Sequence, residues 1–196
     1  MAERAENIIK EVRVYLQDKQ SIEYDDEELL VYLNDALGFI ASLLAENNSS
    51  ITLSSIEYVS APAALPDNFI KADKGEKDGT KLVYKERTVN VAEDEISIVG
   101  DFVYFTPPIT FYYYKNFPKI TKSDEVDIYS PLISFIKNYI IIKALNKLEY
   151  NTQQEQQQLV ELANAILKTC KHRDGLVSIK RTSKKSSFSS FCGSWL

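Results

Sequence analysis

Ile96-Ser97-Ile98-Val99-Gly100-Asp101-Phe102-Val103-Tyr104-Phe105 lies in the middle of the chain and has the pattern of a β-hairpin. Two runs rich in β-branched and aromatic residues flank Gly100-Asp101, a two-residue turn in which glycine supplies a positive φ. Helical periodicity is found on both sides of this region, so the pattern changes from helix to strand and back again. This change predicts a helical protein that carries an inserted β-sheet.

The other strand-like runs extend the insertion to about residues 51–115. They cover residues 51–59, 82–84, 88–91 and 109–114. The polar segment 74–79 is expected to form an exposed loop. Together these runs predict a small antiparallel sheet.

Two helices are expected before the insertion. The first has apolar residues at helical spacing from Ala5 to Leu16. The second starts after Asp25, which can cap it and form a capping box with Glu28. Its apolar stripe begins at Leu30, and the two segments together indicate an antiparallel helical hairpin.

Two further helices are expected after the insertion. Ser130-Pro131 combines a cap with a proline at the first helical position, and an apolar face follows to about residue 148. The fourth helix is predicted over residues 152–172, and Gly175 is well placed to end it. The predicted fold class is therefore mainly α with an inserted small antiparallel β-sheet (α+β). We expect a helical bundle of about four helices in a body of residues 1–175, plus an extended C-terminal arm of residues 176–196.

The expected arm differs in composition from the body. The net charge of the chain is −5, but from Lys168 onward there are seven basic residues and only one acidic residue, Asp174. A segment so rich in serine and lysine buries too little apolar surface to fold alone, which favours an arm held by a partner over a tail packed on its own body. The residues expected to bind that partner are Lys180, Arg181, Lys184, Lys185, Phe188, Phe191, Trp195 and Leu196.

The sequence offers little catalytic chemistry. His172 is the only histidine, and its neighbour Cys170 is better explained as a buried residue at the end of an apolar stripe than as a reactive thiol. The chain has no pair of cysteines at zinc-finger spacing, no HExxH and no phosphate-binding loop. We therefore expect neither enzymatic activity nor a metal or cofactor.

The hydropathy and the N-terminal sequence predict a soluble protein made in the cytosol. No apolar run approaches the ~20 residues that span a bilayer, and Met1-Ala-Glu-Arg-Ala-Glu lacks the layout of a signal peptide. The aromatic run Tyr112-Tyr113-Tyr114, with Phe117, is expected to supply strand core and subunit contacts, because tyrosine gives large contact area at low entropic cost.

The order of short motifs resembles one family. The motifs are Leu29-Leu30-Val31-Tyr32-Leu33-Asn34-Asp35-Ala36, then Ala64-Leu65-Pro66-Asp67-Asn68-Phe69, then Phe111-Tyr112-Tyr113-Tyr114-Lys115-Asn116-Phe117-Pro118, followed by two helices. This layout is similar to that of the head-to-tail adaptor (connector) proteins of short-tailed bacteriophages. The resemblance covers most of residues 22–172.

The resemblance implies a structural virion protein in the neck between capsid and tail, assembled in the host cytoplasm. Members of the family form a ring, usually of twelve subunits, that binds the portal protein and further neck or tail proteins while genomic DNA passes through its channel. A basic tail with aromatic residues matches the C-terminal arms with which such proteins bind the portal. Two alternatives are a nucleic-acid-binding module that uses the basic tail and another neck or tail-completion protein.

Overall fold

The computed structural model describes residues 3–18, 20–126 and 130–174. The chain divides into two compact units. One, the helical unit, contains the described residues up to 40 and those between 119 and 174; the other, the β unit, contains residues 41–118. Each unit is described by itself below.

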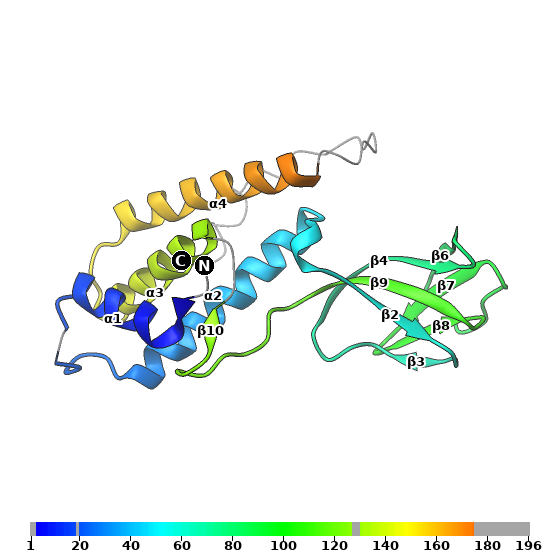
Figure 1. Cartoon of the computed structure of the whole chain (residues 1–196), viewed down its shortest axis with the longest axis horizontal. Coiled ribbons are helices and arrows are strands. Elements are labelled where there is room, and N and C mark those ends of the chain that lie inside the picture. The colour runs from blue at the N-terminus through cyan, green and yellow to red at the C-terminus, as the bar shows by residue number, and fades with distance from the viewer. Residues whose placement is uncertain (1–2, 19, 127–129, 175–196) are drawn as a thin grey trace. The chain divides into compact units, whose positions relative to one another are not determined.

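The four predicted helices are present. They are α1 (Ala5–Tyr15), α2 (Asp26–Glu46), α3 (Ser130–Lys147) and α4 (Gln153–Asp174) (Figure 1). All lie in the helical unit except the end of α2, whose residues from 41 onward belong to the β unit. A two-stranded sheet joins β1 (Glu3–Arg4) to β10 (Glu125–Val126). The backbone N–H groups of Ala5 and Glu6 donate to the carbonyls of Asp124 and Lys122, so the segment before β10 satisfies donors that the first turn of α1 leaves unpaired.

Helix α3 is the central element of this unit. It buries side chains on most of its circumference, and the buried residues are Leu132, Ile133, Phe135, Ile136, Ile140, Ile141, Ile142 and Ala144. A helix that is apolar on most sides is stable only when other elements surround it. Phe135 stacks on Phe39 of α2 with ring centroids 5.9 Å apart.

Helix α2 is long and apolar enough to cross a membrane by length and composition alone. Its residues Leu29, Leu33 and Leu37 are no more than 3% exposed, because they lie in the core of the folded chain. The first turn of α2 carries three acidic residues, and the Glu28 N–H donates to the capping carboxylate of Asp25 (2.6 Å). These are properties of a core helix with a capped N-terminus.

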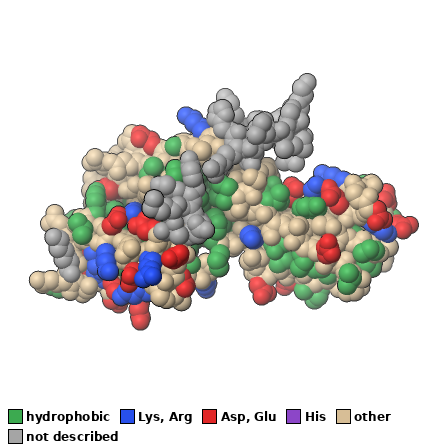
Figure 2. All heavy atoms as spheres, in the orientation of Figure 1, with side chains coloured by type: hydrophobic (Ala, Val, Ile, Leu, Met, Phe, Trp, Pro, Cys, Tyr) green, Lys and Arg blue, Asp and Glu red, His purple; other side chains and the backbone are tan. Residues whose placement is uncertain are grey.

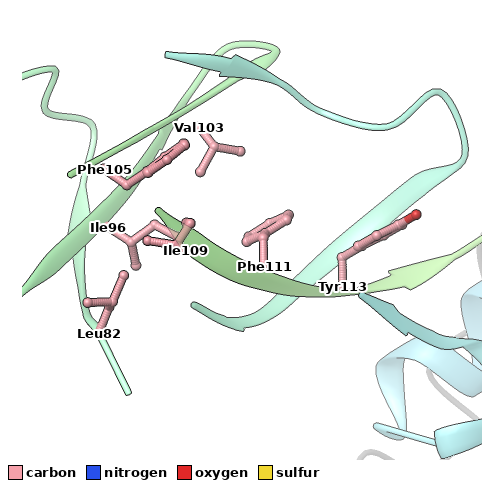
Figure 3. Packing of buried hydrophobic residues seen from close by; sticks show 7 residues of the cluster. All are labelled: Leu82, Ile96, Val103, Phe105, Ile109, Phe111 and Tyr113. Atoms are coloured by element: carbon pink, nitrogen blue, oxygen red, sulfur yellow. The ribbon is translucent and has the colours of Figure 1, made fainter. Parts of the chain in front are cut away.

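The β unit contains two four-stranded sheets. One has the order β2-β9-β4-β5, from strands Leu53–Tyr58, Ile109–Lys115, Phe69–Lys77 and Thr80–Lys81. The other has the order β3-β8-β7-β6, from strands Ala63–Ala64, Phe102–Phe105, Glu95–Val99 and Val83–Glu86. A short 3-10 helix, η1 (Ser50–Thr52), precedes β2. The inner faces of the two sheets share a core of Leu82, Ile96, Val103, Phe105, Ile109, Phe111 and Tyr113 (Figure 3).

The predicted fold class is wrong in its architecture. The chain is not a helical bundle with a small inserted sheet but a mixed α+β fold with three sheets, because residues 41–118 form a compact unit with a core of its own. The prediction of a purely antiparallel sheet is also wrong, since β6 pairs with β7 in parallel. The hairpin at Gly100 is confirmed, with a φ of 59° at that glycine.

Two local predictions in the β unit are also wrong. The segment 74–79 is not a loop, because β4 continues to Lys77 and turns at Asp78-Gly79, whose positive φ angles of 50° and 77° are those of a tight hairpin turn. Residues 88–91 form no strand. Thr88 instead accepts the N–H of Asn90 with its side-chain oxygen (3.2 Å), a local turn that competes with strand pairing.

Candidate interaction surfaces

The β unit contains an open groove between β4 and β6, with a volume of about 760 Å³. Its floor is apolar and includes Phe69, Leu82, Ile96 and Phe111. Three of these side chains belong to the core between the sheets (Figure 3), so the groove is an opening into that core. We call this side of the β unit, formed by β5, β6 and the groove, the β6 flank.

Gly75 sets the depth of the groove floor. A Cβ atom at this position would lie 2.7 Å from Cδ1 of Ile96 and 3.2 Å from Cδ1 of Leu82. The absence of a side chain therefore lets β4 approach the facing sheet closely.

Unpaired strand edges border the groove. β4 pairs with β9 along its length but with β5 only at Glu76 and Lys77, and β6 pairs with β7 alone. Within the described residues, no other strand pairs with β4 before Gly75 or with the outer edge of β6. All four residues of β6 are exposed, including Val83 and Tyr84. An exposed edge of this kind is a template for pairing with another chain.

The rim of the groove carries three lysines, Lys71, Lys74 and Lys81, and one acid, Asp73. Lys74 forms an ion pair with Glu76, whose carboxylate raises the pKa of the lysine, and its amine lies 4.5 Å from the ring centroid of Tyr112. Lys71 donates to the side-chain oxygen of Asn48 (3.1 Å). In the part of the chain that the structure describes, neither Lys71 nor Lys81 forms an ion pair, although Lys81 lies opposite Glu76 in the β4–β5 pair and lowers the pKa of that acid.

The opposite side of the β unit, which we call the β2 flank, is formed by β2, β3 and residues 59–62 between them. It exposes Val59 (79%), Leu53 (36%) and Ile56 (36%). Glu57 is exposed and takes part in no ion pair among the described residues. On the face drawn in Figure 2, hydrophobic side chains reach the surface of the β unit beside charged ones.

The predicted subunit contacts are divided between core and surface. Tyr113 and Tyr114 are buried, and Tyr113 stacks on Phe111 with ring centroids 6.0 Å apart. Tyr112 and Phe117 are half-buried. The run therefore contributes to the strand core, as expected, while its role in subunit contacts stays a prediction.

The predicted arm lies outside the described residues. This applies to Lys180, Arg181, Lys184, Lys185, Phe188, Phe191, Trp195 and Leu196. The side chains of Cys170 and His172 are also outside the described part. Across the residues that the structure does describe, no three His, Cys, Asp or Glu side chains lie together so that they could hold a metal ion.

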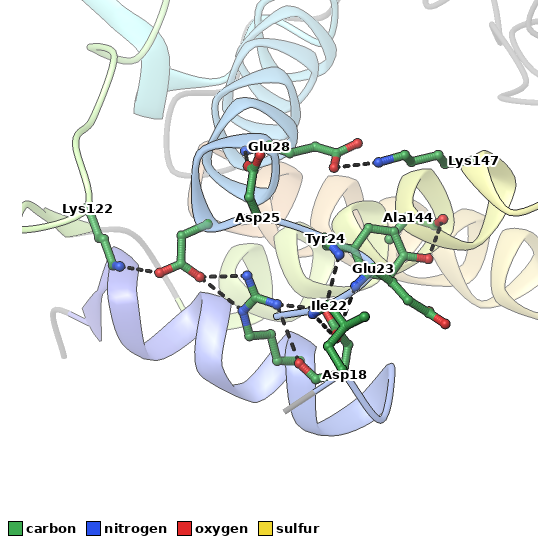
Figure 4. Close-up of polar contacts among 11 residues, drawn as sticks. Asp18, Ile22, Glu23, Tyr24, Asp25, Glu28, Lys122, Ala144 and Lys147 are labelled. Carbon is green, nitrogen blue, oxygen red and sulfur yellow. Dashed lines mark hydrogen bonds and ion pairs between the residues drawn. The ribbon is translucent and has the colours of Figure 1, made fainter. Parts of the chain in front are cut away.

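An acidic cluster at the start of α2 is used inside the helical unit. Asp26 accepts from Nη2 of Arg13 (2.7 Å) and pairs with Lys122, and Glu28 accepts from Nζ of Lys147 (2.7 Å) (Figure 4). Such acids could be expected to line a channel or meet a neighbouring subunit. Here three of these carboxylate contacts instead join α1, α2, α3 and the segment before β10.

Asp18 is the most enclosed carboxylate of this network. It accepts backbone N–H groups from Ile22 (2.8 Å) and Tyr24 (3.2 Å), and Nη1 of Arg13 lies 2.7 Å from its Oδ2. Burial alone would raise the pKa of Asp18, but these N–H donors and the guanidinium outweigh it, so the pKa lies below its ordinary value. The loop between α1 and α2 is thus folded around one carboxylate. Next to it, the Tyr24 hydroxyl donates to the Ala144 carbonyl (2.8 Å) and ties the loop to α3.

The network predicts a loss of stability in acid. Lys122 and Arg13 lower the pKa of Asp26 below its ordinary value, and Lys147 does the same to the pKa of Glu28. A carboxyl with a lowered folded pKa stabilises the fold fully above its unfolded pKa, and the stabilisation is lost as the pH falls through the folded pKa. We expect the urea midpoint to be steady from neutral pH to about pH 5 and to fall steadily below pH 4.5.

The matched control for this profile is Asp26→Asn. This variant starts from a lower midpoint at neutral pH and has a shallower acid limb, since one titrating group is absent. A variant profile parallel to that of the wild type would contradict the assignment of acid sensitivity to this network.

Comparison with known proteins gives no family assignment: no family model matches the chain, and a search of curated proteins finds no significant match.

Proposed function

We propose that this chain is a structural virion protein, a head-to-tail adaptor that forms an oligomeric ring, binds the portal protein and connects the capsid to the tail. The observation that carries the proposal is the order of parts. A helical hairpin, an inserted β unit and two further helices are followed by a basic sequence with aromatic residues. The adaptors of short-tailed bacteriophages, which the sequence resembles, have the same order of parts.

The motifs behind this resemblance have definite structural roles. Asn34 of the Leu-Asn motif donates to the Leu30 and Ile120 carbonyls (3.0 and 3.1 Å) and accepts the Ile120 N–H (2.9 Å). It therefore fixes the segment by which the chain returns from the β unit to the helical unit. The Leu65-Pro66-Asp67 step forms the turn into β4, where the Phe69 N–H donates to the Pro66 carbonyl (2.9 Å). Motifs at such junctions support a shared arrangement of elements more strongly than motifs within one helix.

The acidic body of the chain would let DNA pass through the ring without binding to it. Before Lys168, the chain has 27 of its 28 acidic residues but only 16 of its 23 basic residues. A ring built from such bodies repels phosphate and lets DNA slide through its channel, whereas a basic channel would hold the DNA. The basic and aromatic tails would bind the portal, and many identical tails on one ring give avidity from weak individual contacts.

The proposal is tested by measuring the mass of the full-length protein, alone and mixed with the portal protein of the same virus, by native mass spectrometry. A ring that forms with the portal supports an adaptor. A chain that stays monomeric and ignores the portal overturns it. Binding to tail proteins but not to the portal would favour another neck or tail-completion protein. DNA binding with a steep dependence on salt would favour a nucleic-acid-binding module.

Truncation after Gly175 should abolish joining to portal-containing heads and leave the body folded. The removed segment carries all the residues expected to bind the portal, while the described elements of both units precede it. Circular dichroism checks the fold, and co-sedimentation with heads checks the joining.

A matched control keeps the full length of the chain and replaces Phe188, Phe191 and Trp195 with alanine. If the aromatic residues anchor the arm, this variant joins heads as poorly as the truncated one. Normal joining by the truncated chain would show that the arm is not the portal-binding element.

A further inference from the structure

The two flanks of the β unit are complementary to each other, and we propose that the β2 flank of one copy docks on the β6 flank of the next copy, with Val59 in the groove. The proposal rests on the ring proposed above and names the contact that would build it. It is carried by three independent features of the described residues, namely backbone edges, apolar surface and charge.

The first feature is a pair of strand edges that pair with no other described strand. β2 is six residues long and pairs only with β9, so its outer edge is unpaired among the described strands. Its sequence, Leu-Ser-Ser-Ile-Glu-Tyr, contains no proline or lysine, two residues that often prevent an edge from pairing. β6 presents the corresponding free edge in the other sheet. Pairing between them would satisfy both edges.

The second feature is the match of apolar surface. The β2 flank carries an exposed valine, Val59, directly after its strand, and the β6 flank carries an open groove with an apolar floor. Val59 would leave water on entering an apolar groove, and this burial favours the contact. The protruding side chain and the groove are on different flanks of one unit, so the contact requires two copies of the chain.

The third feature is charge. Glu57 lies on the β2 flank, and Lys71 and Lys81 lie on the rim of the groove, all three without an ion-pair partner among the described residues. Docking would bring opposite charges together and fix the register of the two strands. The same rim disfavours the basic C-terminal sequence as an occupant, because Lys180 and Arg181 would meet lysines.

The geometry of such a contact is that of a ring. The two flanks are different surfaces, so each copy uses one flank to bind its neighbour on one side and the other flank on the other side. A heterologous contact of this kind closes into a ring when the rotation between copies allows it. A contact between two identical flanks would give only a dimer.

The test uses cysteines at the two flanks, in a full-length chain with Cys170 and Cys192 replaced by serine. One variant carries V59C and a second carries K81C, and each is mixed with the portal protein so that the complex forms. After mild oxidation, we expect disulfide dimers when the two variants are mixed before assembly. Neither variant alone should give them. A chain with both substitutions should give a ladder of cross-linked multimers.

A charge exchange gives a second readout. E57K should weaken self-association by about tenfold, and combining it with K71E and K81E should restore it, because the opposite charges face each other again. A triple variant that assembles no better than E57K would overturn the proposed register.

The outcomes separate this proposal from the proposed function. Rings that form on the portal without any cross-link between positions 59 and 81 overturn the contact but leave the adaptor function standing. No ring on the portal overturns the function itself. A cross-link between K81C and the native Cys192, in a chain that retains it, would show that the tail occupies the groove, and this would overturn docking between flanks.

Discussion

Replacing Phe111 with alanine is expected to destabilise the β unit by about 3–5 kcal/mol. The side chain is 1% exposed and lies at the centre of the core between the sheets. Its ring is 5.9 Å from the centroid of Tyr58 and 6.3 Å from that of Phe69. The truncation removes these contacts and leaves a cavity that the rigid strands around it can fill only in part. The loss should appear as a lower midpoint of urea unfolding. The backbone N–H groups of the strands in the β unit should also exchange faster.

Phe102→Ala is the matched control, because Phe102 is 46% exposed on β8, a strand of the other sheet in the same unit. It should change the free energy of unfolding by less than about 1 kcal/mol. Equal losses from the two substitutions would contradict the position of the core. Hydrogen exchange in α3 should respond less than exchange in β9 if the two units unfold separately.

The helices could be predicted because each carries its own signal. The apolar spacing of α1 and the cap at Asp25 are local features, so their expected ranges agree with the structure to within one or two residues. The hairpin at Gly100 is local in the same sense. The acidic network was missed because its partners are distant in sequence. Lys122 is 96 residues from Asp26, and Lys147 is 119 residues from Glu28.

The architecture of the β unit was missed for a related reason. The polar residues of β4 lie on a strand of which one face is half-exposed, so Lys74-Gly75-Glu76-Lys77 has the composition of a loop. The sequence did contain one signal for this strand. Asp78-Gly79 is a favoured two-residue hairpin turn, and such a turn directly follows a strand. The parallel pairing of β6 with β7 had no comparable signal in the sequence. It depends on the path of the connection between the two strands, residues 87–94. The groove is lined in part by these two strands, so it could not be predicted from the sequence either.

Arg13→Met should cost about 3 kcal/mol of unfolding free energy, the largest effect expected for a single polar residue of the helical unit. Arg13 is 6% exposed, and its guanidinium donates to the carboxylates of both Asp18 and Asp26. Methionine keeps the length of the side chain but leaves the buried carboxylate of Asp18 without the guanidinium that neutralises its charge, which is more costly than removing both groups. The expected result is a lower urea midpoint together with faster exchange of the loop N–H groups that Asp18 accepts.

Lys122→Met provides the comparison that separates burial from charge. Both variants remove one positive charge from the same carboxylate of Asp26, but Lys122 is 54% exposed while the Arg13 side chain is 7% exposed. An exposed ion pair contributes at most about 1 kcal/mol, because water solvates either group when the other is lost. The Lys122 variant should therefore stay close to wild type in stability and keep its loop protected from exchange. If the two variants lost equal stability, net charge rather than the buried guanidinium would hold the junction between α1 and α2. In that case high salt should weaken the wild type as much as the substitution does.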